Sequence, residues 1–267
     1  MTELRRITEL ASVRLAPNPG PMTLDGTNSY LLRRETGGPA VVVDPGPEDA
    51  AHLQALAAAG PVELILITHH HRDHTEGAAT LHALTGAPVR APSAADCHGG
   101  EVLADGEQII AAGLTIEVLA TPGHTADSVC FALPDDGPHG SVLTGDTVLG
   151  RGSTVIGIPD GTLAQYLHSL RLLASLGPMR GLPAHGPDLP DLAAACAQYL
   201  QHREERLDQV RGALAELGIA AADADLDQLQ GSAYDAVYGA VYGDVDPSVQ
   251  FAARHSLAAQ LAYLRGE

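Results

Sequence analysis

The sequence predicts an α+β fold: a mixed, largely antiparallel pair of β-sheets with helices outside them, followed by a smaller helical region. From residue 28 to about residue 185, short runs of β-branched residues alternate with Ala/Leu-rich stretches and with Gly/Pro turns. Several strand-like runs follow one another directly between residues 114 and 145, as the strands of antiparallel sheets do. A doubly wound parallel sheet is disfavoured because no G-x-G-x-x-G turn follows any strand.

The expected elements are identified by residue type and by the turns that bound them. Strands, which favour β-branched and aromatic residues, are expected over 29–34, 40–44, 63–68, 88–92, 114–123, 128–134 and 141–146. Helices, where Ala and Leu dominate, are expected over 48–60, 75–86 and 161–177.

The character of the chain changes after the segment PAHGPDLPDL. Residues 189–217 carry apolar side chains at intervals of three and four, which predicts one long amphipathic helix. An Asp-rich turn over 223–227, the segment 234–244 and a helical stretch over 247–266 are expected to follow it.

This change predicts a larger domain over residues 1–187 and a helical domain over residues 188–267, which is a usual size for a small domain. Arg203 and Arg206 lie on the long helix. We expect both to be salt-bridged on the helix surface that faces the larger domain.

The formal net charge is −18, and all 15 basic residues are arginine. Such a surface repels polyanions, which argues against nucleic acid and anionic membranes as partners. Residues 187–267 hold thirteen acidic and five basic residues, so the helical region is acidic as well. Because no apolar run is long enough to span a bilayer and the first twenty residues lack an apolar signal core, we expect a cytoplasmic protein.

The segment THHHRDH, residues 68–74, places four histidines and an aspartate at the end of a predicted buried strand. In an extended stretch His69 and His71 lie on one side and His70 on the other, so His69 and His71 can reach one point together. Asp73 and His74 project in different directions as the loop turns into a helix. They are suited to a second point nearby.

Three further residues of ligand type follow other predicted strands: His124 in ATPGHT, Asp146 in LTGDT and His185 in LPAHG. Each is adjacent to a glycine, which permits a sharp turn and a close backbone approach. Imidazole with carboxylate suits zinc, and iron or manganese stays an alternative. Two such ions would acidify a shared water, and Asp73 could orient the resulting hydroxide and act as general base.

Taken in order, HHHRDH, TPGHT, TGDT and PAHG, preceded by TNSYLL and VVVDPGP, resemble the metallo-β-lactamase-fold hydrolases over residues 24–187. The resemblance implies an αββα sandwich with two metals at one edge, between the sheets. It implies the following ligands: His69, His71 and His124 for one metal, Asp73, His74 and His185 for the other, and Asp146 bridging both. Asp44, in VVVDPGP, would lie beneath the metal ligands, although an ordinary turn explains an aspartate there equally well.

The branch of the family is indicated by smaller features. The metal motif resembles that of glyoxalase II, whose C-terminal basic patch includes the lysines that this chain lacks. The segments TGDTVLG, YLHSLRLL, PAHGP and QHREERLDQV resemble the β-lactamase-like 2 group, in which a helical, winged-helix-like region follows. A carboxylate at position 146 is typical of esterases, thioesterases and phosphodiesterases of the family, whereas true β-lactamases usually lack an acid there.

We therefore expect a dinuclear zinc hydrolase that uses a metal-bridging hydroxide to cleave a small acyl ester or thioester. One alternative is a single-strand endoribonuclease of the β-lactamase-like 2 type, which the acidic helical region and the absence of tryptophan disfavour. A second alternative is a metal-dependent partner-binding or sensing protein. The sequence leaves the substrate and the oligomeric state open.

Overall fold

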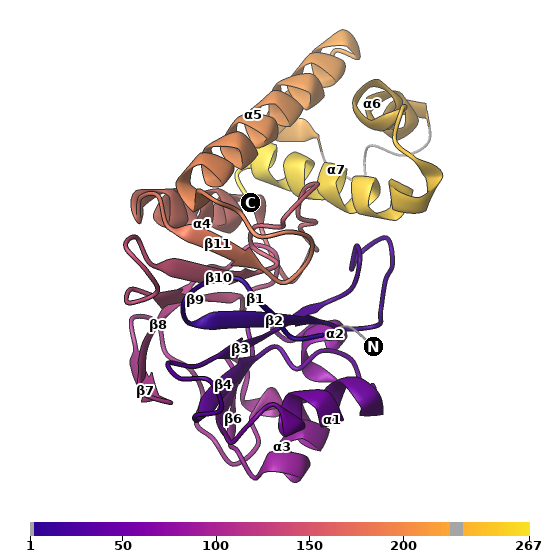
Figure 1. Ribbon diagram of the computed structural model, residues 1–267. Coiled ribbons are helices and arrows are strands. Elements are labelled where there is room, and N and C mark those ends of the chain that lie inside the picture. Colours follow the sequence, from indigo (N-terminus) through magenta and orange to yellow (C-terminus); the bar gives the residue numbers. More distant parts are fainter. Residues whose placement is uncertain (1–2, 225–231) are drawn as a thin grey trace.

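The computed structural model describes residues 3–224 and 232–267, and in it two β-sheets pack face to face with helices on both outer sides (Figure 1). Both sheets contain parallel and antiparallel pairs. The first sheet has the order β1 (Arg5–Arg6), β2 (Ala11–Leu15), β3 (Asn28–Leu32), β4 (Ala40–Val43), β5 (Val62–Leu66) and β6 (Val89–Arg90). The second has the order β11 (Arg180–Pro183), β10 (Ser141–Gly145), β9 (Val129–Leu133), β8 (Leu114–Ala120) and β7 (Gln108–Ala111).

Strands in the middle of each sheet are buried on both faces. On β3, Tyr30 and Leu32 join the core between the sheets, whereas Leu31 packs on the outer side with Leu53 and Leu81 from helices. Alternate side chains of a strand point to opposite faces, so a strand covered on both sides reads as an unbroken apolar run. This explains why the central strands were predictable from their composition.

The helices cover the two outer faces and form the C-terminal region. Those over the first sheet are α1 (Ala50–Ala58), α2 (Arg72–Thr75) and α3 (Ala78–Thr85). Those beyond the second sheet are α4 (Leu163–Ser175), α5 (Leu192–Glu216), α6 (Ser232–Tyr242) and α7 (Gln250–Arg265). Short 3₁₀ turns occupy Ala94–Asp96, Ala221–Asp223 and Pro247–Val249.

The predicted αββα sandwich with a helical C-terminal region is confirmed, with differences in detail. The helix expected over 75–86 is divided at Gly77, whose backbone N–H donates to the carbonyl of Gly46 at 2.9 Å. A Cβ there would lie 2.6 Å from Cδ2 of Leu53 and 3.1 Å from the carbonyl oxygens of Gly46 and Pro47, so this close approach favours glycine. The Asp-rich turn expected over 223–227 lies mostly outside the described residues.

The helical region is packed against the sandwich. Leu207 of α5 and Ala259 of α7 belong to the same buried cluster as Val142 of β10 and Leu167 of α4. In residues 188–224 and 232–267 it contains helices and no strand, so the hairpin of a winged helix is not found there. Among the described residues, no helix combines the length and the apolarity needed to cross a membrane.

Candidate metal centre

Three imidazoles converge at the edge of the sandwich where β5 and β8 end. The Nδ1 atom of His71 lies 3.0 Å from Nε2 of His69 and 3.0 Å from Nε2 of His124. Nδ1 of His71 carries at most one hydrogen, so it can donate a hydrogen bond to only one of these two nitrogens. A carboxylate oxygen of Asp146 completes a group whose ligand atoms all lie within 4.8 Å of one another. Imidazole nitrogens gathered with a carboxylate are a donor set that zinc prefers.

A second group lies beside the first and consists of Asp73, His74 and His185. Oδ2 of Asp73 is 3.1 Å from Nε2 of His185 and 3.4 Å from Nε2 of His74. Both histidines are fully or nearly fully buried, whereas the Asp73 side chain is 27% exposed. Within this group the carboxylate is therefore the side chain that water and a substrate can reach.

Asp146 lies between the two groups and presents one oxygen to each. Oδ2 is 3.5 Å from Nε2 of His124, while Oδ1 is 3.4 Å from Nε2 of His185 and 3.6 Å from Nε2 of His74. Oδ1 of Asp146 and the two Nε2 atoms are buried, and none of them makes a hydrogen bond of good geometry within the described residues. Because buried polar atoms are nearly always satisfied, such a cluster fits a site that holds cations. The structure thus brings together all seven ligands predicted from the sequence.

Backbone carbonyls fix the orientation of two of the rings. Nδ1 of His124 donates to the carbonyl of Val155 at 2.7 Å, and Nδ1 of His185 donates to the carbonyl of Gly26 at 3.1 Å. A carbonyl can only accept, so Nδ1 must carry the proton and Nε2 can present its lone pair to the site. Neither carbonyl was predicted, since backbone groups leave no signature in residue identity.

Asp44 lies directly behind His74, as the resemblance implied. The carboxylate is 2% exposed, accepts from the backbone N–H and the hydroxyl of Thr68 at 2.8 and 2.7 Å, and accepts from Nδ1 of His74 at 2.9 Å. The Thr68 hydroxyl in turn accepts from Nδ1 of His69 at 3.1 Å. One buried carboxylate therefore orients a ring in each ligand group, an arrangement typical of metal sites.

Two glycines allow the ligands that follow them to enter the site. Gly123 has φ +139°, and a Cβ there would lie 2.4 Å from the backbone of Tyr166. Gly145 has φ +49°, and a Cβ there would lie 2.9 Å from the side chain of Thr68. The glycine preceding His124 and the one preceding Asp146 are thus required by both conformation and space.

Two rings of the first group, His69 and His71, favour the neutral form. Burial, together with the neighbouring imidazoles of His74 and His124, lowers the pKa of His69 well below its usual value. Burial and the proximity of His124 lower the pKa of His71 to about 4. At neutral pH both rings therefore carry lone pairs that are available to a metal ion.

In the second group the charged forms of the side chains are favoured. Burial favours the neutral form of His74, but Asp44 and Asp73 outweigh it and raise the pKa of the ring well above its usual value. Burial acts likewise on His185, where Asp146 and Asp73 raise the pKa. Burial would raise the pKa of Asp73, but the two imidazoles outweigh it and hold that pKa well below the usual range. A cation entering this group would displace imidazole protons, so its binding is linked to proton release.

His70 contacts a different set of residues from its neighbours in the motif. Its Nδ1 lies 2.9 Å from Asp127 and its Nε2 lies 3.4 Å from Asp160, and its side chain is 42% exposed. Together with His71 and Asp160 it could itself form a small, exposed set of ligand atoms. It does not belong to either buried group.

The expected surface salt bridges of Arg203 and Arg206 are wrong. Within residues 3–224 and 232–267, neither guanidinium has a carboxylate partner. Arg203 is 3% exposed, stacks over the ring of Tyr166 at 5.0 Å and donates from Nη2 to the carbonyl of Thr154. The 3/4 periodicity had already placed Arg203 on the packed side of the long helix, which was the signal that favoured burial.

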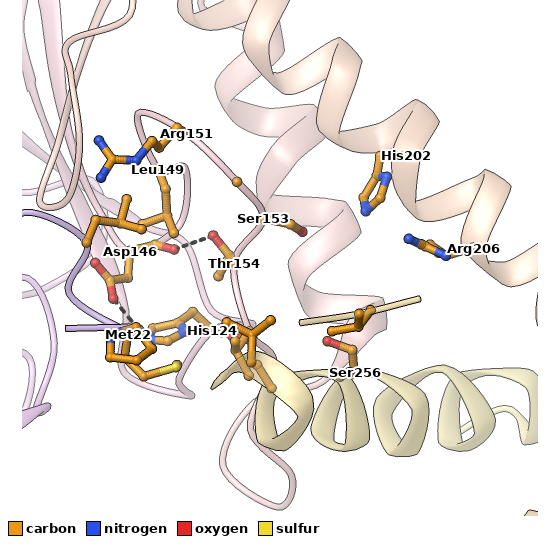
Figure 2. Close-up of a pocket in the computed structure, with 18 of the residues that line it drawn as sticks. Met22, His124, Asp146, Leu149, Arg151, Ser153, Thr154, His202, Arg206 and Ser256 are labelled. Atoms are coloured by element: carbon orange, nitrogen blue, oxygen red, sulfur yellow. Dashed lines mark hydrogen bonds and ion pairs between the residues drawn. The ribbon is translucent and has the colours of Figure 1, made fainter. Parts of the chain in front are cut away.

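Arg203 thereby connects α5 to the loop that supports the metal ligands. The Thr154 hydroxyl donates to the carbonyl of Asp146 at 2.8 Å, and the next residue, Val155, supplies the carbonyl that orients His124. Figure 2 shows Thr154 between Asp146 and the C-terminal helices. The helical region therefore helps to position ligands that come from the sandwich.

A cavity of about 320 Å³ adjoins the site and runs toward α5 and α7. His124 and Asp146 line one end, and His202, Arg206 and Ser256 line the other (Figure 2). Its volume lies at the lower end of the range for small-molecule sites.

Comparison with known proteins identifies relatives. The family model of the metallo-beta-lactamase superfamily matches residues 22–185. A lactamase-like protein of Aspergillus niger is 36% identical over 222 residues, which cover 80% of this chain and 67% of that protein. A protein of Aspergillus chevalieri named atrochrysone carboxyl ACP thioesterase is 34% identical, with 81% of this chain and 69% of that protein covered.

Solved structures support the fold at low sequence identity. A beta-lactamase domain protein of Burkholderia ambifaria has a TM-score of 0.74 at 24% identity, covering 99% of this chain and 89% of that one. A metallo-beta-lactamase family protein of Thermus thermophilus has a TM-score of 0.71 at 23% identity, covering 96% and 93%. The shared architecture extends through the helical region, since nearly the whole chain is covered in both.

Proposed function

The chain belongs to the metallo-β-lactamase superfamily and is a hydrolase, and from this premise we propose that it cleaves acyl thioesters with two zinc ions bound. The observation that carries the proposal is the position of Asp146, whose two oxygens face two separate groups of ligand atoms while its side chain also lines the cavity. A reacting carbonyl held in the cavity would lie beside both groups. That relatives bear the name ACP thioesterase supports a thioester as the bond cleaved.

The ligand assignment follows the two groups. His69, His71 and His124 would hold one ion, Asp73, His74 and His185 the other, and Asp146 would reach both. The buried atoms of His74, His185 and Asp146 that make no hydrogen bond within the described residues support the fit of this site to metal ions. When bound, the two ions would acidify a water molecule and withdraw electron density from the thioester carbonyl.

The residues of the chain would supply orientation and proton transfer. Asp73, the accessible carboxylate of its group, would orient the attacking water and accept its proton. Asp44 and Thr68 would hold the rings behind it, so that the ligands need not reorganise during the reaction. The cavity walls would bind the acyl chain and exclude bulk water.

The test is a metal analysis combined with a substrate panel. After expression with ample zinc, we expect about two zinc ions per chain and hydrolysis of acyl thioesters. Removal of zinc by a chelator should abolish hydrolysis and lower the melting temperature, because an ion that binds only the native state stabilises it, and added zinc should restore both.

Two results would contradict this proposal. Less than one metal ion per chain would remove its basis. Cleavage of single-stranded RNA in place of thioesters, lost in Asp73→Ala, would show that the bond is a phosphodiester.

A positioning role is expected for Arg203. Arg203→Met removes the donor to the Thr154 carbonyl while keeping a long apolar side chain, and should lower kcat/KM by about 10- to 100-fold, as expected for residues that orient ligands. The measurement is kcat/KM for a thioester together with zinc affinity by competition with a chelator.

The matched control for this variant is Arg211→Met. Arg211 lies on the same helix, where its guanidinium binds Glu204 and Asp208 on the surface. A loss of thermal stability in Arg203→Met with unchanged zinc affinity and kcat/KM would mean that Arg203 supports only the fold.

A further inference from the structure

The end of the cavity that lies away from the metal ligands is built by the helical region. His202 and Arg206 come from α5 and Ser256 from α7, and Figure 2 shows them across the cavity from His124 and Asp146. Between the two ends the walls are mainly aliphatic, with Met22, Leu24, Leu149, Val155, Val245 and Val249. The cavity therefore has a candidate reaction centre at one end, an apolar middle and a cationic end.

Three guanidinium groups line the cavity. Arg151 pairs with Asp25, and Arg203 is buried on Thr154 and Tyr166, so Arg206 is the more accessible cation on α5 at this end. Its Nη1 donates to the carbonyl of Val241 at 2.7 Å and to Oε1 of Gln209 at 2.9 Å, and its guanidinium lies 5.1 Å from the ring of Tyr242. These contacts fix the plane of the guanidinium. They use only Nη1, so in the described part of the chain the donors on Nε and Nη2 stay without an acceptor, and no carboxylate pairs with the charge.

His202 lies one helical turn before Arg206 and contributes polarity without charge. Burial, followed by the nearby guanidinium groups of Arg203 and Arg206, lowers the pKa of this imidazole. At neutral pH it is therefore an uncharged ring that can donate or accept one hydrogen bond at the same end of the cavity.

We propose that the substrate is an acyl thioester that carries a carboxylate at the end of the acyl chain away from the thioester, and that this carboxylate binds Arg206. This inference rests on the proposed function. A carboxylate would accept charge-assisted hydrogen bonds from the unused donors of the guanidinium. The aliphatic walls would contact the methylene chain between the two ends. We assign the anionic group to the acyl chain and not to a phosphate of the leaving group, because the aliphatic walls between the two ends suit methylene groups better than the amide-bearing arm that carries such a phosphate.

The test compares matched thioesters of N-acetylcysteamine, a leaving group without phosphate. Dicarboxylic monothioesters of four to twelve carbons are compared with plain acyl thioesters of the same length, using the zinc-loaded protein. At the chain length that fits the cavity, we expect kcat/KM to favour the carboxylate series by about 10- to 100-fold, mainly through KM, as for a hydrogen bond to a charged group.

Variants of Arg206 test whether its side chain causes the preference for the carboxylate series. Arg206→Gln should reduce the ratio between the two series to near one, and Arg206→Lys, which keeps the charge, should retain part of it. Arg211→Gln, on the exposed face of the same helix, should leave the ratio unchanged. Calorimetric binding of free dicarboxylates against monocarboxylates gives a readout independent of turnover.

The outcomes separate this inference from the proposed function. Hydrolysis of both series with equal kcat/KM at every length would overturn the carboxylate site and leave the thioesterase proposal intact. A preference for anionic substrates seen only with coenzyme A thioesters would assign the anion to the leaving group and also overturn it. If no thioester is hydrolysed, the proposed function fails, while tighter binding of dicarboxylates that is lost in Arg206→Gln would still support the anion site.

Discussion

Asp73→Asn is expected to lower kcat/KM for a thioester by about 100- to 10,000-fold, the range for loss of a group that transfers a proton. The amide preserves the shape of the side chain but can neither accept the proton of the attacking water nor carry negative charge. In the structure Asp73 is the accessible member of its group, and His74 and His185 hold its pKa well below the usual range, so it is ionised throughout the neutral pH region.

The measurement is steady-state kinetics with metal analysis of the same samples. Glu76→Gln is the matched control, because Glu76 lies three residues later and pairs with Arg72 on the surface. If Asp73→Asn keeps both ions and loses activity, the residue acts on the substrate. If it also loses an ion, its main contribution is as a ligand. Wild-type kinetics in Asp73→Asn would remove it from the mechanism.

The candidate site could be predicted from the sequence because its ligands follow rules of local geometry. The alternation of side chains along an extended segment separates His69 and His71 from His70, and the structure places His70 on Asp127 and Asp160, outside the buried groups. His124 and Asp146 were identifiable because each directly follows a glycine at a strand end. Such signals are local, so one sequence was enough to find them.

The fold was predictable at most of the strands that are buried on both faces and less so elsewhere. The strands β1 (Arg5–Arg6), β2 (Ala11–Leu15), β7 (Gln108–Ala111) and β11 (Arg180–Pro183) were missed. The strand β1 is two exposed residues, and β2 and β7 alternate buried residues with more exposed ones. The strand β11 contains Gly and Pro, which are rare inside strands. They form strands because they pair with a neighbouring strand, and such pairing leaves little trace in local composition.

The cavity was beyond prediction for a related reason. Its two ends come from residues about eighty positions apart, His124 and Arg206, and its shape depends on how α5 and α7 pack against the loop after β10. Arg203 illustrates the difficulty: its type suggested a surface salt bridge, whereas its position in the apolar periodicity indicated burial. The packed position prevailed because a backbone carbonyl and an aromatic ring accommodate the guanidinium.

Asp146→Asn is expected to reduce the zinc content from about two ions per chain to about one and to lower kcat/KM by about 100-fold or more, beyond the range for residues that only orient ligands. The reason is geometric. Oδ2 faces His124 in one group and Oδ1 faces His185 in the other, so an uncharged amide with a single acceptor oxygen can serve only one of them.

Asp135→Asn is the control for this variant, since Asp135 is 55% exposed and pairs with Arg34 at 3.5 Å, away from the site. Metal analysis should be done on freshly purified protein and again after dialysis against excess zinc, because weakened binding and lost binding differ only in the second sample. Two ions retained with normal activity would show that Asp146 does not bridge. One ion retained with normal activity would show instead that a single ion is sufficient for hydrolysis, and the catalytic roles would then have to be assigned to one ligand group alone.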